Sequence, residues 1–90
     1  MALQADGRSI ELRRPLIIGR KPDCDVRLDD HRIGDRHAEI YQVGDLWWIR
    51  DLGSDDGVYV NGEIVEAALL DPTAEIRLGA NGPTLLLCSP

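Results

Sequence analysis

Short runs of apolar and β-branched residues alternate along the chain with turn-forming pairs that contain glycine. Glycine and asparagine readily adopt the positive φ angles of tight hairpin turns, so such pairs predict turns between strands. The pairs are Asp6-Gly7, Gly44-Asp45, Asp56-Gly57, Asn61-Gly62 and Asn81-Gly82. The runs between them predict strands at residues 9–12, 16–19, 26–28, 37–43, 46–51, 58–60, 76–78 and 84–87.

The same pattern gives little indication of helices. No window keeps an apolar stripe at the i, i+3, i+4, i+7 spacing over several turns, and residues 63–70 are the one short stretch with helical propensity. Many brief strands separated by turns favour a sandwich or a barrel. Both chain ends carry strand-like sequence, so we expect them to pair and to leave loops at one edge for binding. The prediction is an all-β fold.

Length and composition predict how this fold is built. Ninety residues predict a single domain over residues 1–90. The chain is 43% hydrophobic with 2 Trp, 2 Tyr and no Phe, so aliphatic residues must build the core. Trp47 and Trp48 are adjacent and therefore face opposite sides of a strand, one in the core and the other a candidate contact residue.

The apolar stretches are too short to span a bilayer, and the N-terminus lacks a signal-peptide pattern, so we expect a cytoplasmic protein without direct membrane insertion.

The charge of the chain limits its partners. The formal net charge is −6, from 16 acidic and 10 basic residues. Nucleic acids and anionic membranes require clustered lysine and arginine, so this balance disfavours both. Residues 20–36 hold five basic and five acidic residues around the strand at 26–28. A charged loop on a rigid β scaffold is typical of a recognition site.

The sequence carries no pattern of catalytic or metal-binding residues. Cys24 and Cys88 lack a CxxC spacing, and a reducing compartment disfavours a disulfide between them. Four aspartates in the charged loop lack the spacing and distal glutamate of a calcium loop: Asp23, Asp25, Asp29 and Asp30. The chain also lacks a nucleophile elbow, a triad and a phosphate-binding glycine loop. We therefore expect no enzyme activity, no metal, no cofactor and no small-molecule substrate.

Three segments follow one another in a characteristic order. They are Ile18-Gly19-Arg20 followed by residues 22–26, then His37-Ala38-Glu39-Ile40, then residues 51–54 leading through Gly57 to Tyr59-Val60-Asn61-Gly62. Together they resemble the forkhead-associated (FHA) domain over about residues 8–87. The resemblance implies a β-sandwich of about eleven strands in two sheets, with loops at one end that bind phosphothreonine peptides, and no catalysis. It also implies structural roles for Gly19, His37, Asp51, Gly57, Asn61 and Gly62, with the histidine bracing the loops from inside.

The resemblance further implies a phosphothreonine-binding face, at which this chain departs from the family pattern. Arg20 matches the family's arginine after the strand-ending glycine. The Ser-Arg pair that precedes the structural histidine is here Gly34-Asp35, followed by Arg36. The family's Asn-Gly-Thr segment is here Asp56-Gly57-Val58. Since a phosphate needs cations and hydrogen-bond donors, these changes predict that phosphate binding is mostly lost.

Two functions within this fold stay open at this point. The first is a phosphorylation-independent interaction or scaffolding module, as in the cytosolic part of a larger bacterial signalling or secretion assembly. The second is a phosphothreonine-peptide reader that uses Arg20 with Arg32 or Arg36. Arg20 can equally be a solvated loop residue paired with Asp35 or Asp56. In each case the partner is another protein or peptide.

Overall fold

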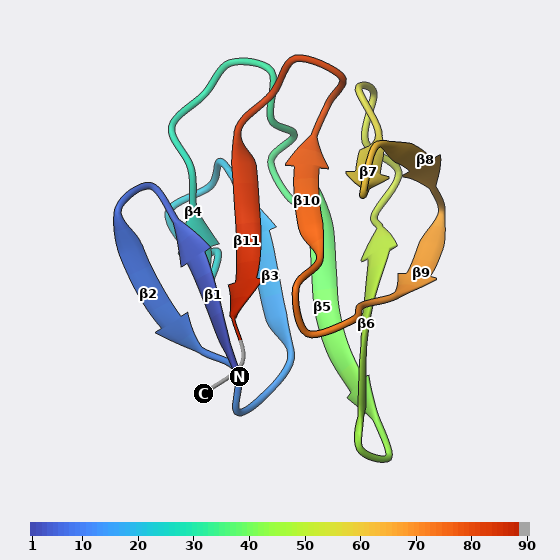
Figure 1. The fold of residues 1–90 in the computed structure, drawn as a ribbon. Coiled ribbons are helices and arrows are strands. Elements are labelled where there is room, and N and C mark those ends of the chain that lie inside the picture. Colours follow the sequence, from blue (N-terminus) through green and yellow to red (C-terminus); the bar gives the residue numbers. More distant parts are fainter. Residues whose placement is uncertain (89–90) are drawn as a thin grey trace.

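In the computed structural model, which describes residues 1–88, eleven strands form two sheets that pack face to face (Figure 1). The six-stranded sheet has the order β2 (Arg8–Glu11), β1 (Ala2–Ala5), β11 (Thr84–Cys88), β10 (Glu75–Leu78), β7 (Val58–Val60), β8 (Glu63–Val65). The five-stranded sheet has the order β4 (Val26–Arg27), β3 (Leu16–Gly19), β5 (Ala38–Val43), β6 (Leu46–Asp51), β9 (Ala67–Leu69). The predicted all-β sandwich is confirmed; residues 89 and 90 of the expected domain lie outside the described residues.

The strand pairing joins the two ends of the chain. β1 lies antiparallel to β11, with Leu3 opposite Leu87. The chain ends pair as expected, but through β1, where no strand was predicted; the predicted N-terminal strand, β2, pairs with β1 instead of β11. β3 and β4 form a parallel pair, whereas the other pairs are antiparallel. Within residues 1–88 no helix is long and apolar enough to cross a membrane.

The core lies between the two sheets and is built mainly from aliphatic side chains. Alternate residues of each strand point inward, so the buried set includes Leu3, Ile18, Ile40, Ile49, Ile76 and Leu85. Trp47 is buried in this core with 7% of its surface exposed, while Trp48 is half-buried on the outer face of the five-stranded sheet. The two adjacent tryptophans therefore face opposite sides of β6, as predicted.

Residues 63–70 are not helical, which corrects the helical propensity expected there. Glu63–Val65 forms β8 and pairs with β7, while Ala67–Leu69 forms β9 and pairs with β6. The chain thus passes from one sheet to the other at Glu66. Each segment completes the edge of a sheet, and this tertiary pairing outweighs the weak local preference. The sequence pattern also did not predict β1, because only two residues, Leu3 and Ala5, form its buried face.

The predicted turns are found between the strands. Asn61 and Gly62 both have positive φ, at 51° and 88°, and connect β7 to β8 as a two-residue hairpin. In the loop between β10 and β11 the positive φ lies at Gly79 and not at Asn81-Gly82.

Candidate functional site

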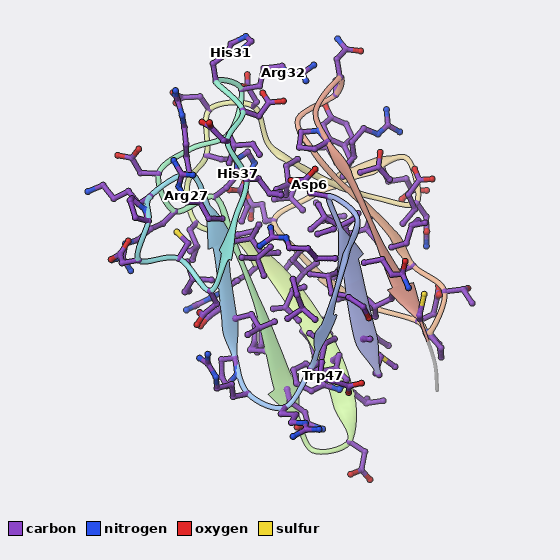
Figure 2. The ribbon with its side chains drawn as sticks, turned by 90° about the vertical axis from the view of Figure 1, so that its left-hand side faces the viewer. Asp6, Arg27, His31, Arg32, His37 and Trp47 are labelled. Atoms are coloured by element: carbon purple, nitrogen blue, oxygen red, sulfur yellow. The ribbon has the colours of Figure 1, made fainter. Side chains whose placement is uncertain are left out.

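Several loops gather at one end of the sandwich. They are the β3–β4, β4–β5, β6–β7 and β10–β11 loops, and Figure 2 places His31 and Arg32 at the outer tip of this end, with Trp47 towards the other. Hydrogen bonds join the loops, because Gly79 N–H donates to Gly57 O at 2.9 Å and Arg20 N–H donates to Gly34 O at 3.0 Å. The end of the molecule predicted to bind therefore forms one connected surface.

The end of β3 fits closely against the β4–β5 loop. Arg20 N–H also donates to Asp35 O at 3.1 Å, and the Cys24 thiol donates to the same oxygen at 3.2 Å. A Cβ atom added at Gly19 would lie 2.2 Å from Asp35 O. Only glycine allows this close approach, which places the Arg20 backbone beside residues 34 and 35.

His37 is fully buried beneath the loops and joins two of them. Gly34 N–H donates to its Nδ1 at 3.1 Å, and its Nε2 lies 2.7 Å from Gly57 O. Because Nδ1 accepts, the ring proton must be on Nε2, which donates to the carbonyl. The ring is therefore a neutral brace between the β4–β5 and β6–β7 loops, and both of its nitrogens are occupied.

The β6–β7 loop is shaped by its own side chains. Ser54 N–H donates to Asp51 Oδ1 at 2.8 Å, and Gly57 N–H donates to Ser54 Oγ at 3.0 Å. These bonds place Asp56 on the surface, whereas the Val58 side chain is 0% exposed and belongs to the core.

The Arg32 guanidinium is occupied by neighbouring acceptors. Its Nε and Nη2 donate to the two Asp30 carboxylate oxygens at 3.0 and 2.7 Å, and its Nη1 donates to Asn81 O. These hydrogen bonds hold the pKa of Asp30 well below its usual range and raise the pKa of Arg32. Asp56 adds a weaker attraction to Arg32.

The other two candidate arginines also face carboxylates. Arg36 forms an ion pair with Asp23. Arg20 has Nε at 4.0 Å from Asp29 Oδ1, so its nearest ion pair is with Asp29 and not with Asp35 or Asp56 as expected. Sequence reasoning did not identify Asp29, Asp30 and Asp23 as partners of these arginines, although the even balance of charge over residues 20–36 pointed to pairing within the loop.

The Asn61-Gly62 turn lies away from this end. Val58 is opposite Leu78 and Val60 is opposite Ile76, so Asn61 reaches the beginning of β10. There Asn61 N–H donates to Glu75 O at 2.8 Å, and Glu75 N–H donates to Asn61 Oδ1 at 2.9 Å. The side chain of Asn61 fixes the turn to the neighbouring strand.

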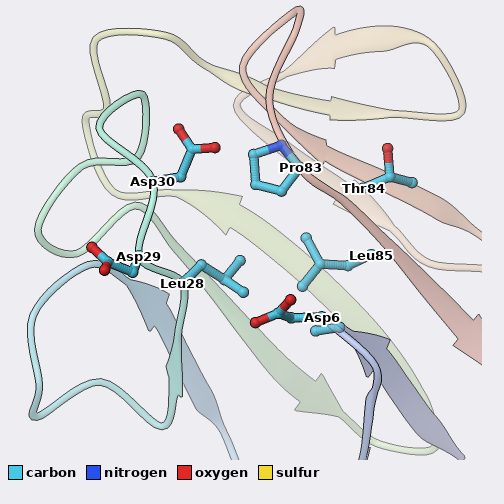
Figure 3. A pocket seen from close by; sticks show the side chains of 8 residues that line it. Asp6, Leu28, Asp29, Asp30, Pro83, Thr84 and Leu85 are labelled. Carbon is cyan, nitrogen blue, oxygen red and sulfur yellow. The ribbon is translucent and has the colours of Figure 1, made fainter.

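A cavity of about 220 Å³ opens beside the loop end (Figure 3). Leu28 and Leu85 form its buried floor, and Asp6, Asp29 and Asp30 surround it. Arginines balance two of these three acids, since Arg32 pairs with Asp30 and Arg20 with Asp29. The cavity has an acidic rim and no surplus of positive charge that would hold an anion.

The cysteines and acidic side chains do not form a metal centre. Among residues 1–88 no three His, Cys, Asp or Glu side chains lie close enough together to hold a metal ion, and both cysteines are free. Burial raises the pKa of the Cys24 thiol, as expected for a packed cysteine and not for a reactive one.

Comparison with known proteins gives one consistent family. The FHA domain model matches residues 16–79. The oxoglutarate dehydrogenase inhibitor of Corynebacterium jeikeium is 43% identical over 61 residues, which cover 68% of this chain and 42% of that protein. The glycogen accumulation regulator GarA of Mycolicibacterium smegmatis is also 43% identical over 61 residues, covering 68% of this chain and 39% of that protein. The chain therefore spans about two fifths of the length of these relatives.

Solved structures agree with this family over nearly the whole chain. The FhaA FHA domain complexed with the intracellular domain of Rv3910 has a TM-score of 0.85 at 36% identity, covering 94% of this chain and 96% of that one. An FHA domain solved in work on phosphothreonine-dependent FHA domain interactions has a TM-score of 0.86 at 35% identity, covering 99% and 96%. The FHA domain of CT664 from Chlamydia trachomatis has a TM-score of 0.88 at 28% identity, covering 99% and 96%.

Proposed function

This chain belongs to the FHA domain family, and we propose on that basis that it recognises another protein or peptide without reading a phosphothreonine. FHA domains are non-catalytic interaction modules, and this chain is likewise not an enzyme. The finer part of the proposal, independence from phosphorylation, depends on the residues at the loop end.

The observation that carries the proposal is the chemistry of the surface where the family holds the phosphate. Gly34 has no hydroxyl, and its N–H already donates to His37. Asp35 and Asp56 are exposed carboxylates at positions where the family pattern has an arginine and an asparagine. The surface thus offers acceptors where a phosphate needs donors.

The arginines that could compensate are engaged elsewhere. Arg32 would have to leave both oxygens of Asp30 and the Asn81 carbonyl, and Arg36 would have to leave Asp23. Arg20 is the least engaged of the three, because its contact with Asp29 spans 4.0 Å. A single exposed arginine is a weak basis for phosphate recognition.

The magnitudes favour loss of phosphate binding. A phosphothreonine carries nearly two negative charges, and at about 5 Å each unit charge pair is worth about 1–3 kcal/mol. Each lost charge-assisted hydrogen bond costs about 1.5–3 kcal/mol. Even half of the combined effect of Gly34, Asp35 and Asp56 weakens binding on the order of a thousandfold.

The alternative function is a phosphothreonine reader that uses Arg20 with Arg32 or Arg36. It receives support from relatives such as EmbR of Mycobacterium tuberculosis, whose structure contains a low-affinity phosphopeptide and is 30% identical to this chain. This alternative predicts salt-sensitive binding that disappears on dephosphorylation and in an Arg20→Ala variant.

Isothermal titration of the ninety-residue chain with a phosphothreonine peptide library separates the two functions. We expect no saturable binding in the micromolar range, for the natural chain and for Arg20→Ala alike. Micromolar binding that Arg20→Ala abolishes would replace our proposal with the alternative.

We also propose that the chain works in the cytoplasm as part of a larger signalling or secretion assembly. Support comes from analogy, since its relatives include regulators such as GarA, and the FhaA FHA domain binds an intracellular domain of a second protein. Fractionation of native cells tests the location, and recovery of the protein exclusively outside the cytoplasm would contradict it.

A further inference from the structure

The net charge of the chain is confined to one part of the sequence. Residues 45–71 contain seven acidic residues and one basic residue, Arg50, which gives −6; the remaining nine acidic and nine basic residues cancel. Arg50 is itself paired with Glu39, with Nε 2.7 Å from Oε1. This segment runs from β6 through β9 and forms one side of the sandwich (Figure 1). In the rest of the molecule the acidic and basic residues are equal in number, so the molecule has one distinctly acidic side.

A groove of about 370 Å³ lies on this acidic side, between the β6–β7 loop and β8. Asp51, Asp55 and Glu66 contribute carboxylates to its lining, and residues 51–66 contain no lysine or arginine. The ion pairs within residues 1–88 involve none of these three side chains. Their negative charge therefore remains available to a cation from outside.

The spacing of these carboxylates favours an organic cation over a metal ion. They are not gathered closely enough to coordinate a metal, since no such group exists in the described part of the chain. A lysine ammonium or an arginine guanidinium carries several donors on a long side chain, and it can satisfy carboxylates that are farther apart.

The groove also has an apolar wall. Ile64 is 65% exposed, more than any other large exposed hydrophobic side chain of residues 1–88, and Val65 beside it is half-buried. Ile64 lies on β8, the edge strand of the six-stranded sheet. The methylene groups of a lysine or arginine, or a neighbouring apolar residue, can pack on this wall while the cationic group meets the carboxylates.

From this combination we propose that the groove lined by Asp51, Asp55, Ile64 and Glu66 docks a basic, partly apolar segment of a partner protein. The inference rests on the proposed function, because it names the chemistry of the partner that the interaction module binds. A second copy of the chain is disfavoured as the occupant, because its net charge of −6 repels this acidic side.

An NMR titration tests the proposal with a short peptide in which lysine and leucine alternate, and with its counterpart in which glutamine replaces lysine. We expect saturable shifts of the amides of residues 51–57 and 63–66 with the lysine peptide. The glutamine peptide is expected to bind at least roughly tenfold more weakly, since exposed charge pairs each contribute about 1.4- to 5-fold.

Matched variants separate docking from general attraction to an acidic protein. Asp55→Asn combined with Glu66→Gln is expected to weaken binding of the lysine peptide roughly three- to tenfold. Asp6→Asn combined with Glu11→Gln changes the net charge equally on the other side of the molecule, so its effect is expected to stay below about twofold. Ile64→Ser, a change at an exposed position, is expected to weaken binding about threefold while leaving the fold intact.

Three outcomes would overturn the docking proposal: equal weakening by both double variants, shifts spread over the whole surface, or self-association of the chain in place of peptide binding. A phosphothreonine peptide titrated in parallel reports on the proposed function separately. Shifts with that peptide at residues 20, 34–36 and 56–58 would contradict independence from phosphorylation, whatever happens in the groove.

Discussion

His37 holds the loops of the binding end together from inside the molecule. Its ring bonds to Gly34 N–H and Gly57 O, and its backbone N–H donates to Ile18 O at 2.8 Å. Removal of the ring takes the acceptor from the half-buried Gly34 N–H, leaves Gly57 O with Gly79 N–H as its remaining donor, and opens a cavity.

We expect His37→Ala to lower the free energy of unfolding by about 2–4 kcal/mol, measured by urea denaturation. His31→Ala is the control, because His31 is exposed at the tip of the same loop, and its effect should stay within about 0.5 kcal/mol. A loss of similar size in both variants would show that His37 does not act as a brace.

For single residues, the sequence predicted which positions lie at the loop end better than it predicted the contacts that their side chains make. The motif located Gly34, Asp35 and Asp56, and the structure places all three at the loop end. It could not indicate that Arg32 reaches Asn81, because that contact joins loops 49 residues apart. The motif also could not show that the Val58 side chain is buried. Val58 stands where the loop ends and the alternating strand begins, and the sequence does not say to which of the two its side chain belongs.

Among the strands, β3 requires glycine at its last residue, Gly19. A Cβ atom at Gly19 would overlap Asp35 O, a backbone atom that cannot move alone. We expect Gly19→Ala to destabilise the fold by about 1–3 kcal/mol, measured by thermal or urea unfolding. Gly34→Ala is the matched control in the adjoining loop, because its Cβ would have its nearest neighbours at 3.9 Å. If the two substitutions have the same effect, the close approach of β3 to the loop is not a constraint.

The parallel pair of β3 and β4 is held by a carboxylate. Asp25 Oδ2 accepts Ile17 N–H at 2.8 Å, and Asp25 Oδ1 pairs with Arg14. The Ile17 hydrogen bond, together with Arg14, lowers the pKa of Asp25. A lowered pKa in the folded state adds stability that is present above the unfolded value, about 4, and is lost as the pH falls through the folded value.

Asp25→Asn is therefore expected to be less stable than the natural chain at pH 7, with the difference shrinking as the pH falls below about 4 and lost below the lowered pKa of Asp25. Urea denaturation across this pH range measures it, with Asp45→Asn at an exposed turn as the control. A difference that persists unchanged at acid pH would show that the charge of Asp25 is not what holds the pair.

The elements were predictable where the pattern was strong. β3, β6 and β7 begin and end at the predicted residues, because their apolar runs are bounded by clear turn signals. β8 and β9 were missed, since both are edge strands without a strong apolar run and owe their conformation to a neighbouring strand. Short edge strands of this kind carry little local signal.

For the whole molecule, the class of fold followed from the sequence, and the pairing of the chain ends followed in part, because the strand that pairs with β11 is β1 and not the predicted strand at residues 9–12. The acidic side did not follow from the sequence, although its charges are all visible in residues 45–71. Only the fold shows that β6 to β9 lie together and that Asp55 and Glu66 share a groove with Ile64.

The central claim, that this FHA domain does not read phosphothreonine, is tested most directly by restoring the family's residues at the loop end. The variant carries Gly34→Ser, Asp35→Arg and Asp56→Asn, and a second version adds Val58→Thr. The first three positions have room for the change, whereas Val58 is buried, so the second version is expected to be less stable by about 1–3 kcal/mol.

Both variants and the natural chain are titrated with the same phosphothreonine peptides. We expect no saturable binding to the natural chain and a gain of at least about a hundredfold in at least one variant, because the new cation and donors face the phosphate. Micromolar binding by the natural chain, unchanged in the variants, would contradict the account and assign phosphate recognition to Arg20 with Arg32 or Arg36.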